Sequence, residues 1–285
     1  MTVERPFFFA RRETRLFGFL HEPATPGARL GFVLSHAFAE EKLWSHRVLV
    51  SFARALAARG HPVLRFDYAG AGDSGGETAN TSLDSHLDDL RTAVGTLDSM
   101  VPGLERIGLI GLRLGATFAA LLAEEAAAGT APAVLREAPL VLWDPVVDGA
   151  AYLQDVLRAN LSAQLASHGR VIETREVMIR RIADGGVVNV DGYEIAKSFF
   201  GSISVSPLLR TEGLEHRGPT LVVAITTPGK PAKPHPVLDA LAAAYRNGER
   251  RSVEEHQFWR EIKQFYGAAP QLQSATLDWL GGLDG

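Results

Sequence analysis

Apolar runs and segments of helical periodicity alternate along this chain. Four apolar runs have the pattern of strands buried on both faces of a sheet, at 30–35, 62–66, 107–110 and 140–143. Apolar residues spaced three and four positions apart predict helices at 44–59, 83–97, 116–128 and 271–280. Further strands are expected at 7–11, 15–21, 220–225 and 252–254. The alternation favours an α/β fold with a mostly parallel, doubly wound sheet of eight strands.

The alternation stops between residues 149 and 206. Four leucines spaced four apart predict one face of a helix there, namely Leu153, Leu157, Leu161 and Leu165. A second helix is expected over 174–182 and a hairpin over 187–193. We interpret 149–206 as a cap inserted into a core formed by 1–148 and 207–285. The leucines then face either that core or a ligand pocket beneath the cap.

The composition narrows the range of functions. A net charge of −4, from 29 basic and 33 acidic residues, gives no reason to expect nucleic acid as a partner. The sequence has no cysteine, so disulfides, thiolate metal sites and cysteine nucleophiles are excluded. We see no metal-ligand spacing and no phosphate-binding or dinucleotide motif, and expect no metal or cofactor. Without a signal-peptide pattern or an apolar run of spanning length, we expect a cytoplasmic monomer or homodimer with no membrane span.

Two glycine-containing turns carry the strongest chemical signal. The strand at 107–110 leads into a Gly-x-Arg-x-Gly turn made by Gly111, Arg113 and Gly115, and a helix follows. The strand at 62–66 leads into Asp-Tyr-Ala-Gly-Ala-Gly-Asp-Ser at 67–74. Glycine permits the positive φ angles and close chain approach that such turns need. The first turn lies at the carboxyl ends of predicted parallel strands, where open α/β sheets bind ligands. Asp67 and Asp73 of the second turn are expected to be structural turn residues.

These turns, with the strand order and the insertion after the sixth strand, resemble the α/β-hydrolase superfamily over nearly the whole chain. The central residue of the first turn is then the expected nucleophile, at a strained strand-to-helix turn. Here it is Arg113, which stays protonated, accepts no proton and cannot attack a carbonyl. A narrower resemblance, to hydrolase-like proteins associated with bacterial exosortase systems, is carried by 37–41, 111–116, 142–146 and 258–259. That group shares the GLRLGA turn, which implies that Arg113 is a family feature.

Arg113 has two compatible interpretations. Helix N-termini favour anions, so the guanidinium and the flanking Leu112 and Leu114 are expected to seat a substrate carboxylate or phosphate. Alternatively, Arg113 forms a buried ion pair with Asp144 or Glu40 that joins two loops. We expect either Glu40 or Glu41, at the end of the loop 36–43, to act as a base or as a partner of Arg113, and the other to be solvated.

Proton-transfer candidates have to replace a standard triad. His36 lies where related hydrolases place an oxyanion loop, and the main-chain N–H of Phe38 is a candidate oxyanion donor. His256 is the best-placed triad histidine, with His235 as its competitor. The segment 220–230 after the seventh strand offers no acid, so Asp144 is the candidate to orient His256, or else only caps the turn before Pro145. Each of these residues also has a purely structural interpretation.

Three functions remain open. The first is an atypical enzyme that moves protons or activates water directly, acting on an anionic or acyl-bearing small molecule or peptide. Epimerisation, elimination, decarboxylation and non-covalent hydrolysis all fit it. The second is a hydrolase-like binding or scaffold protein without chemistry. The third is a conventional hydrolase whose nucleophile lies elsewhere, although Ser35 and Ser74, the nearest serines, occupy no nucleophile turn. Lys230 and Lys233 are expected in a solvated proline-rich loop.

Overall fold

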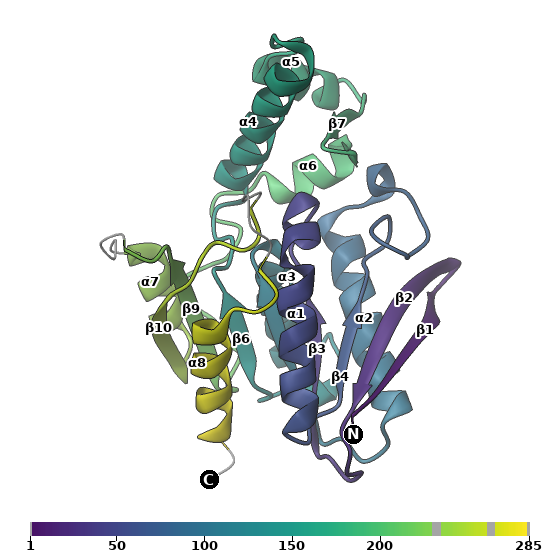
Figure 1. The fold of residues 1–285 in the computed structure, drawn as a ribbon, viewed down its shortest axis with the longest axis vertical. Coiled ribbons are helices and arrows are strands. Elements are labelled where there is room, and N and C mark those ends of the chain that lie inside the picture. Colours follow the sequence, from purple (N-terminus) through teal and green to yellow (C-terminus); the bar gives the residue numbers. More distant parts are fainter. Residues whose placement is uncertain (1, 230–234, 261–265, 284–285) are drawn as a thin grey trace.

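An eight-stranded sheet forms the centre of the protein (Figure 1), whose structure is a computed structural model that describes residues 2–229, 235–260 and 266–283. The strand order is β1-β2-β4-β3-β5-β6-β9-β10. Pairing is antiparallel between β1 and β2 and between β2 and β4. Every other pair in this sheet is parallel. The predicted mostly parallel, eight-stranded sheet is therefore confirmed.

The bounds of the elements follow the apolar pattern closely in the centre of the sheet. Its strands are β1 (Val3–Arg11), β2 (Thr14–Glu22), β3 (Leu30–Ser35), β4 (Val63–Phe66), β5 (Arg106–Leu112), β6 (Leu140–Trp143), β9 (Thr220–Thr226) and β10 (Gly248–Glu254). The helices of the core are α1 (Glu40–Ala58), α2 (Leu83–Met100), α3 (Leu114–Ala127), α7 (Pro236–Ala244) and α8 (Pro270–Gly281). Two short 3-10 turns lie at Thr78–Asn80 and Ala133–Leu135.

Helices cover both faces of the sheet. Successive side chains of a strand point to opposite faces, and a strand that is apolar throughout therefore has to be covered on both faces. On β5, Leu109 packs into the cluster that includes α2, α3 and α7, whereas Ile110 packs into the cluster that includes α1 and α8. Both side chains are almost fully buried. The sheet is thus the middle of three layers. Because β3, β5 and β6 are neighbours and run parallel, their carboxyl ends lie side by side at the same end of the sheet.

The segment between β6 and β9, which we call the inserted segment, does not follow the strand–helix alternation of the core. It contains α4 (Gly149–His168), α5 (Arg175–Ala183), the hairpin of β7 (Val188–Val190) and β8 (Tyr193–Ile195), and α6 (Lys197–Ile203). Figure 1 shows this inserted segment at one end of the molecule, beyond the end of the sheet. Its leucine stripe faces inward over only part of its length, since Leu153 and Leu157 are buried and Leu165 is 55% exposed.

Several predicted bounds are wrong for identifiable reasons. Helix α1 begins at Glu40, inside the expected loop 36–43, and two acidic residues in its first turn interact favourably with the helix dipole. Strand β10 begins four residues before the predicted 252, because its first half is polar and lacks an apolar pattern. Helices α6 and α7 were not expected from the sequence, and α7 follows a proline-rich stretch with its own proline at the N-terminus.

Two glycines allow β5 and α3 to meet the rest of the core. A Cβ atom at Gly115 would lie 2.3 Å from the carbonyl oxygen of His36, and one at Gly111 would lie 2.4 Å from Cα of Ala116. Real Cβ atoms do not approach backbone this closely. The loop after β3 therefore contacts the first turn of α3 directly.

We predict that Gly115→Ala lowers the free energy of unfolding by at least about 2 kcal/mol, because backbone must shift to admit the methyl group. Gly95→Ala is the matched control. Gly95 lies within α2 and its added Cβ would meet no atom within 4 Å. The control is expected to raise the free energy of unfolding by about 0.5–1 kcal/mol. Urea denaturation measures both, and equal stability of the two variants would contradict the packing described.

Candidate functional site

Arg113 occupies the turn between β5 and α3 in an unusual backbone conformation. Its φ of 55° and ψ of −122° lie outside the regions that side chains other than glycine normally adopt. The main chain holds it there: its N–H donates to the carbonyl of Trp143 at 2.9 Å, and its carbonyl accepts from the N–H of Ala116 at 3.0 Å. The turn projects the side chain from the carboxyl end of β5.

Two carboxylates clamp the Arg113 guanidinium. Nε donates to Oε1 of Glu41 at 3.1 Å, and Nη1 donates to Oδ2 of Asp144 at 3.0 Å and to its carbonyl at 3.2 Å. Tyr152, from the inserted helix α4, donates its hydroxyl to Oε2 of Glu41 at 3.1 Å. We call Glu41, Arg113, Asp144 and Tyr152 the elbow cluster. The ring centroid of Trp259 lies 5.4 Å from the guanidinium carbon and completes its surroundings.

The elbow cluster is largely withdrawn from solvent, which changes its proton affinities. The side chains of Arg113, Glu41 and Asp144 are only 18%, 20% and 16% exposed. Burial opposes the charged form of Arg113, but the two carboxylates outweigh it and raise its pKa. Burial also raises the pKa of Glu41, although Arg113 and Tyr152 act in the opposite direction. Burial thus favours the protonated form of Glu41, whereas Arg113 stays charged.

Comparison with known proteins agrees with this fold. Residues 29–182, more than half of the chain, match the family described as serine aminopeptidase, S33, whose fold is the α/β-hydrolase fold. The chain belongs to this α/β-hydrolase family. No curated protein matches the sequence. The match to the family ends within α5, so it spans the β5–α3 turn, Asp144 and the first half of the inserted segment.

Solved structures support the same α/β-hydrolase fold at low sequence identity. Est1E from Butyrivibrio proteoclasticus with ferulic acid bound is 16% identical, with a TM-score of 0.62 over 96% of this chain and 97% of that one. An esterase of Pyrococcus furiosus is 18% identical, with a TM-score of 0.61 over 100% and 92%. A proline iminopeptidase of Mycobacterium smegmatis is 15% identical, with a TM-score of 0.58 over 98% of each chain.

Of the two adjacent glutamates, the structure brings Glu41 to the hydrolase turn. Glu40 instead accepts a hydrogen bond from the indole N–H of Trp44 at 3.1 Å. The expected partner of Arg113 was Glu40 or Asp144 in an ion pair; Asp144 is one partner and Glu41 the other. Arg113, Glu41 and Asp144 are thus the predicted site residues that the fold gathers into one place.

His36 is held as a neutral, buried side chain. Its Nδ1 lies 2.6 Å from the carbonyl of Ala37, and its Nε2 accepts from the main-chain N–H of Tyr68 at 3.4 Å. Burial lowers the pKa of His36 to about 3. With both ring nitrogens engaged inside the protein, this histidine orders the loop after β3, which was its alternative interpretation.

Three apolar candidates lie in packed surroundings. The side chains of Leu112 and Leu114 have no exposed surface and belong to the two core clusters on opposite faces of the sheet. Phe38 is 8% exposed and stacks on Phe199 of α6, with ring centroids 4.4 Å apart. These placements favour packing over substrate contact for the leucines, and make Phe38 a contact between the core and the inserted segment.

The two candidate triad histidines are placed differently from what a triad needs. His256 is exposed and its ring stacks on Tyr266 at 4.9 Å between centroids. No hydrogen bond among the described residues joins its ring to the elbow cluster. His235 is the N-terminal flanking residue of α7. Lys230 and Lys233 lie outside the described residues.

Sequence reasoning missed two members of the site. Tyr152 gives no local signal, since it is one aromatic residue in a helix. Trp259 belongs to the Phe-Trp pair that carries the narrower family resemblance, but an indole has no titratable group that would mark it as a candidate, unlike His256 three residues earlier. Trp259 is 1% exposed, and its indole nitrogen has no hydrogen-bond partner in the described part of the chain.

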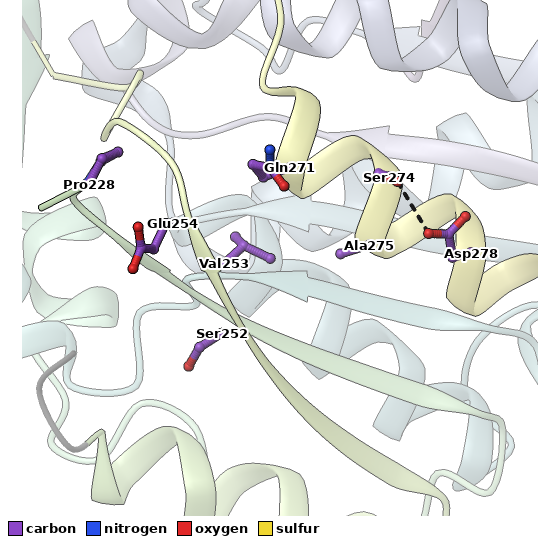
Figure 2. Close-up of a pocket in the computed structure, with 8 residues that line it drawn as sticks. All are labelled: Pro228, Ser252, Val253, Glu254, Gln271, Ser274, Ala275 and Asp278. Atoms are coloured by element: carbon purple, nitrogen blue, oxygen red, sulfur yellow. Dashed lines mark hydrogen bonds between the residues drawn. The ribbon is translucent and has the colours of Figure 1, made fainter.

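One cavity of about 550 Å³ lies between β10 and α8, away from the elbow cluster (Figure 2). Pro228 and Glu254 lie on one side, and Ser274 and Asp278, which share a hydrogen bond of 3.2 Å, on the helix. Over residues 2–229, 235–260 and 266–283, no group of three metal-ligating side chains could hold a metal ion. No helix in those ranges is long and apolar enough to cross a membrane.

We predict that the carboxyl carbon of Glu41, followed by NMR and assigned with Glu41→Gln, titrates above the usual glutamate range. Tyr152→Phe should raise the pKa of Glu41 further, because the hydroxyl hydrogen bond favours the ionised form. Tyr193→Phe, the same change in the hairpin of the inserted segment, should leave it unchanged. A fall in the Glu41 pKa in Tyr152→Phe would contradict the assigned contact.

Proposed function

We propose that this protein is an α/β-hydrolase-fold enzyme that works without an enzyme-bound acyl intermediate. Its substrate class is a small molecule or peptide that carries a carboxylate or acyl group. The observation that carries this proposal is the elbow cluster. A guanidinium anchored by two carboxylates stands at the turn where a hydrolase of this fold presents its nucleophile.

In this proposal Arg113 binds the substrate oxygen. Its Nε and Nη1 are used by Glu41 and Asp144, whereas Nη2 forms no hydrogen bond with the described residues. The N–H groups of Leu114 and Gly115, the first two of α3, are not used within the helix, and they favour negative charge at the same point. A fixed donor beside a helix N-terminus stabilises a carbonyl oxygen that becomes negative in the transition state.

Glu41 is the proton-transfer group in this scheme. Its raised pKa brings it closer to neutral pH, which is where a general acid or base works best. When Glu41 takes up a proton, Asp144 still neutralises Arg113. The guanidinium of Arg113 therefore keeps a carboxylate partner whether Glu41 is protonated or ionised. Proton abstraction next to a carbonyl, or direct activation of a water molecule, fits this arrangement.

The described residues support a conventional serine mechanism less well. Ser35 donates its hydroxyl to the carbonyl of Gly115 at 2.7 Å and lies 2.6 Å from the Tyr68 hydroxyl. Ser74 donates to the carbonyl of Asp67 at 2.5 Å. No serine hydroxyl in the described ranges is hydrogen-bonded to a histidine ring, the contact that activates a serine nucleophile. Neighbours named as esterases and as a proline iminopeptidase support acyl compounds as the substrate class.

The test is incubation with a panel of esters, thioesters, amides and free carboxylates in D₂O. NMR follows deuterium entering the carbon next to the carbonyl and the release of hydrolysis products. With a reacting compound, Glu41→Gln should lose at least about 100-fold in rate, the typical contribution of a general acid or base. Glu40→Gln, a change in the neighbouring carboxyl group, is the matched control and should lose little.

Equal loss in both variants would remove Glu41 from the reaction. Binding of panel compounds to the wild type without any turnover would instead identify a hydrolase-like binding protein. Arg113→Ala should then show whether Arg113 binds the compound, through a rise in its dissociation constant.

A further inference from the structure

A second cavity, of about 530 Å³, lies between α1 and the strands β2 and β4. No member of the elbow cluster lines it. Glu41 faces Arg113, whereas the next residue of α1, Lys42, lines this cavity. The volume is in the range of small-molecule binding sites. Its walls combine phenylalanine rings with charged and titratable side chains, namely Phe17, Phe19, Phe66, Lys42, His46, Arg65, Asp67 and Asp73.

Arg65 is the distinctive group of this cavity. It lies on β4 directly opposite Phe19 of β2, with its guanidinium carbon 5.2 Å from that ring's centroid. Its Nε donates to Nε2 of His21 at 3.0 Å. Burial, together with Arg65, lowers the pKa of His21 to about 4, so His21 is a neutral acceptor near pH 7. His21 in turn has its Nδ1 3.2 Å from Glu4.

The charge of Arg65 is therefore not neutralised by direct contact with an acid. In the described part of the chain it forms no ion pair, and its Nη1 and Nη2 make no hydrogen bond. Burial lowers the pKa of Arg65 to about 10, which still leaves it charged at neutral pH. Half-buried charges are normally paired. Two free guanidinium nitrogens in a cavity form a fork that matches carboxylate and phosphate oxygens.

The other charged side chains of the cavity are one ion pair and the exposed carboxylate of Asp73. Lys42 pairs with Asp67 at 2.8 Å, and Asp67 also accepts the main-chain N–H of Asp73 at 3.0 Å. His46, one helical turn after Lys42, stands at the exposed side of the cavity. Of the two cations Lys42 and Arg65, only Arg65 therefore has no carboxylate partner among the described residues, and the rings of Phe17 and Phe19 lie in the same cavity.

We propose that this cavity is a binding site for a small organic anion, a carboxylate or phosphate monoester on a flat apolar body. The anionic group binds Nη1 and Nη2 of Arg65, and the apolar body lies against Phe17 and Phe19. The site is separate from the elbow cluster and stands whether or not the proposed reaction takes place.

The test is calorimetric titration of the full chain with phenyl phosphate and with benzoate. Benzamide is the neutral counterpart, and inorganic phosphate lacks the apolar body. One site is expected, with at least about tenfold tighter binding of one anion than of benzamide, because the charged oxygens pair with the guanidinium. The anion that binds more tightly shows whether the site prefers a phosphate or a carboxylate. Weaker binding of inorganic phosphate than of phenyl phosphate would show that the rings of Phe17 and Phe19 contribute to affinity. Ring signals of His21 and His46 should shift in NMR spectra during the titration.

Arg65→Gln should weaken binding at least about tenfold, through loss of the charge-assisted bidentate contact. Arg59→Gln, on the exposed end of α1, is the matched control and should bind as the wild type does. If Arg65→Gln does not fold, Arg65→Lys keeps the charge but not the fork and should still lose affinity. Unchanged binding in the folded Arg65 variant, or no binding of either anion at millimolar concentration, would overturn the proposal.

Discussion

The site depends on the compensation of one permanent buried charge. Arg113 cannot lose its proton, and a buried cation without a partner costs several kcal/mol. Its two partners come from separate elements, Glu41 from the first turn of α1 and Asp144 from the end of β6. Parallel pairing of β3, β5 and β6 brings these elements to one edge. Gly115 allows the loop after β3 to pack directly against α3. Both carboxylates therefore lie next to the Arg113 guanidinium.

The same charge ties the inserted segment and the C-terminal region to the core. Tyr152 reaches from α4 to the carboxylate that holds Arg113, and the Trp259 ring lies against the guanidinium from the segment between β10 and α8. Both side chains are almost fully buried beside Arg113, so they form part of its immediate surroundings. Movement of α4 would change the proton affinity of Glu41, because Tyr152 is one of its hydrogen-bond donors. This links the position of the inserted segment to the chemistry we propose.

The sequence predicts the sheet well and the site in part, for physical reasons. Buried parallel strands have an apolar signature, so both ends of β6 are predicted correctly. Arg113 and Asp144 are predicted as neighbours because each follows the last residue of a strand, β5 and β6. The choice between Glu40 and Glu41 depends on where α1 begins, since each residue turns a helix by about 100°. That start lies in a segment with no apolar period. Trp259 and Tyr152 enter through tertiary contacts that no local pattern records.

We propose that an anchored guanidinium stands in place of a covalent nucleophile. Intact-mass spectrometry after incubation with a fluorophosphonate probe tests it most directly, since such probes form stable adducts with activated serines. We expect a protein of unchanged mass, because Ser35 is hydrogen-bonded to Gly115 and Tyr68 inside the core and Arg113 cannot react. A stoichiometric adduct that maps to any serine would contradict it and would return the protein to acyl-enzyme chemistry.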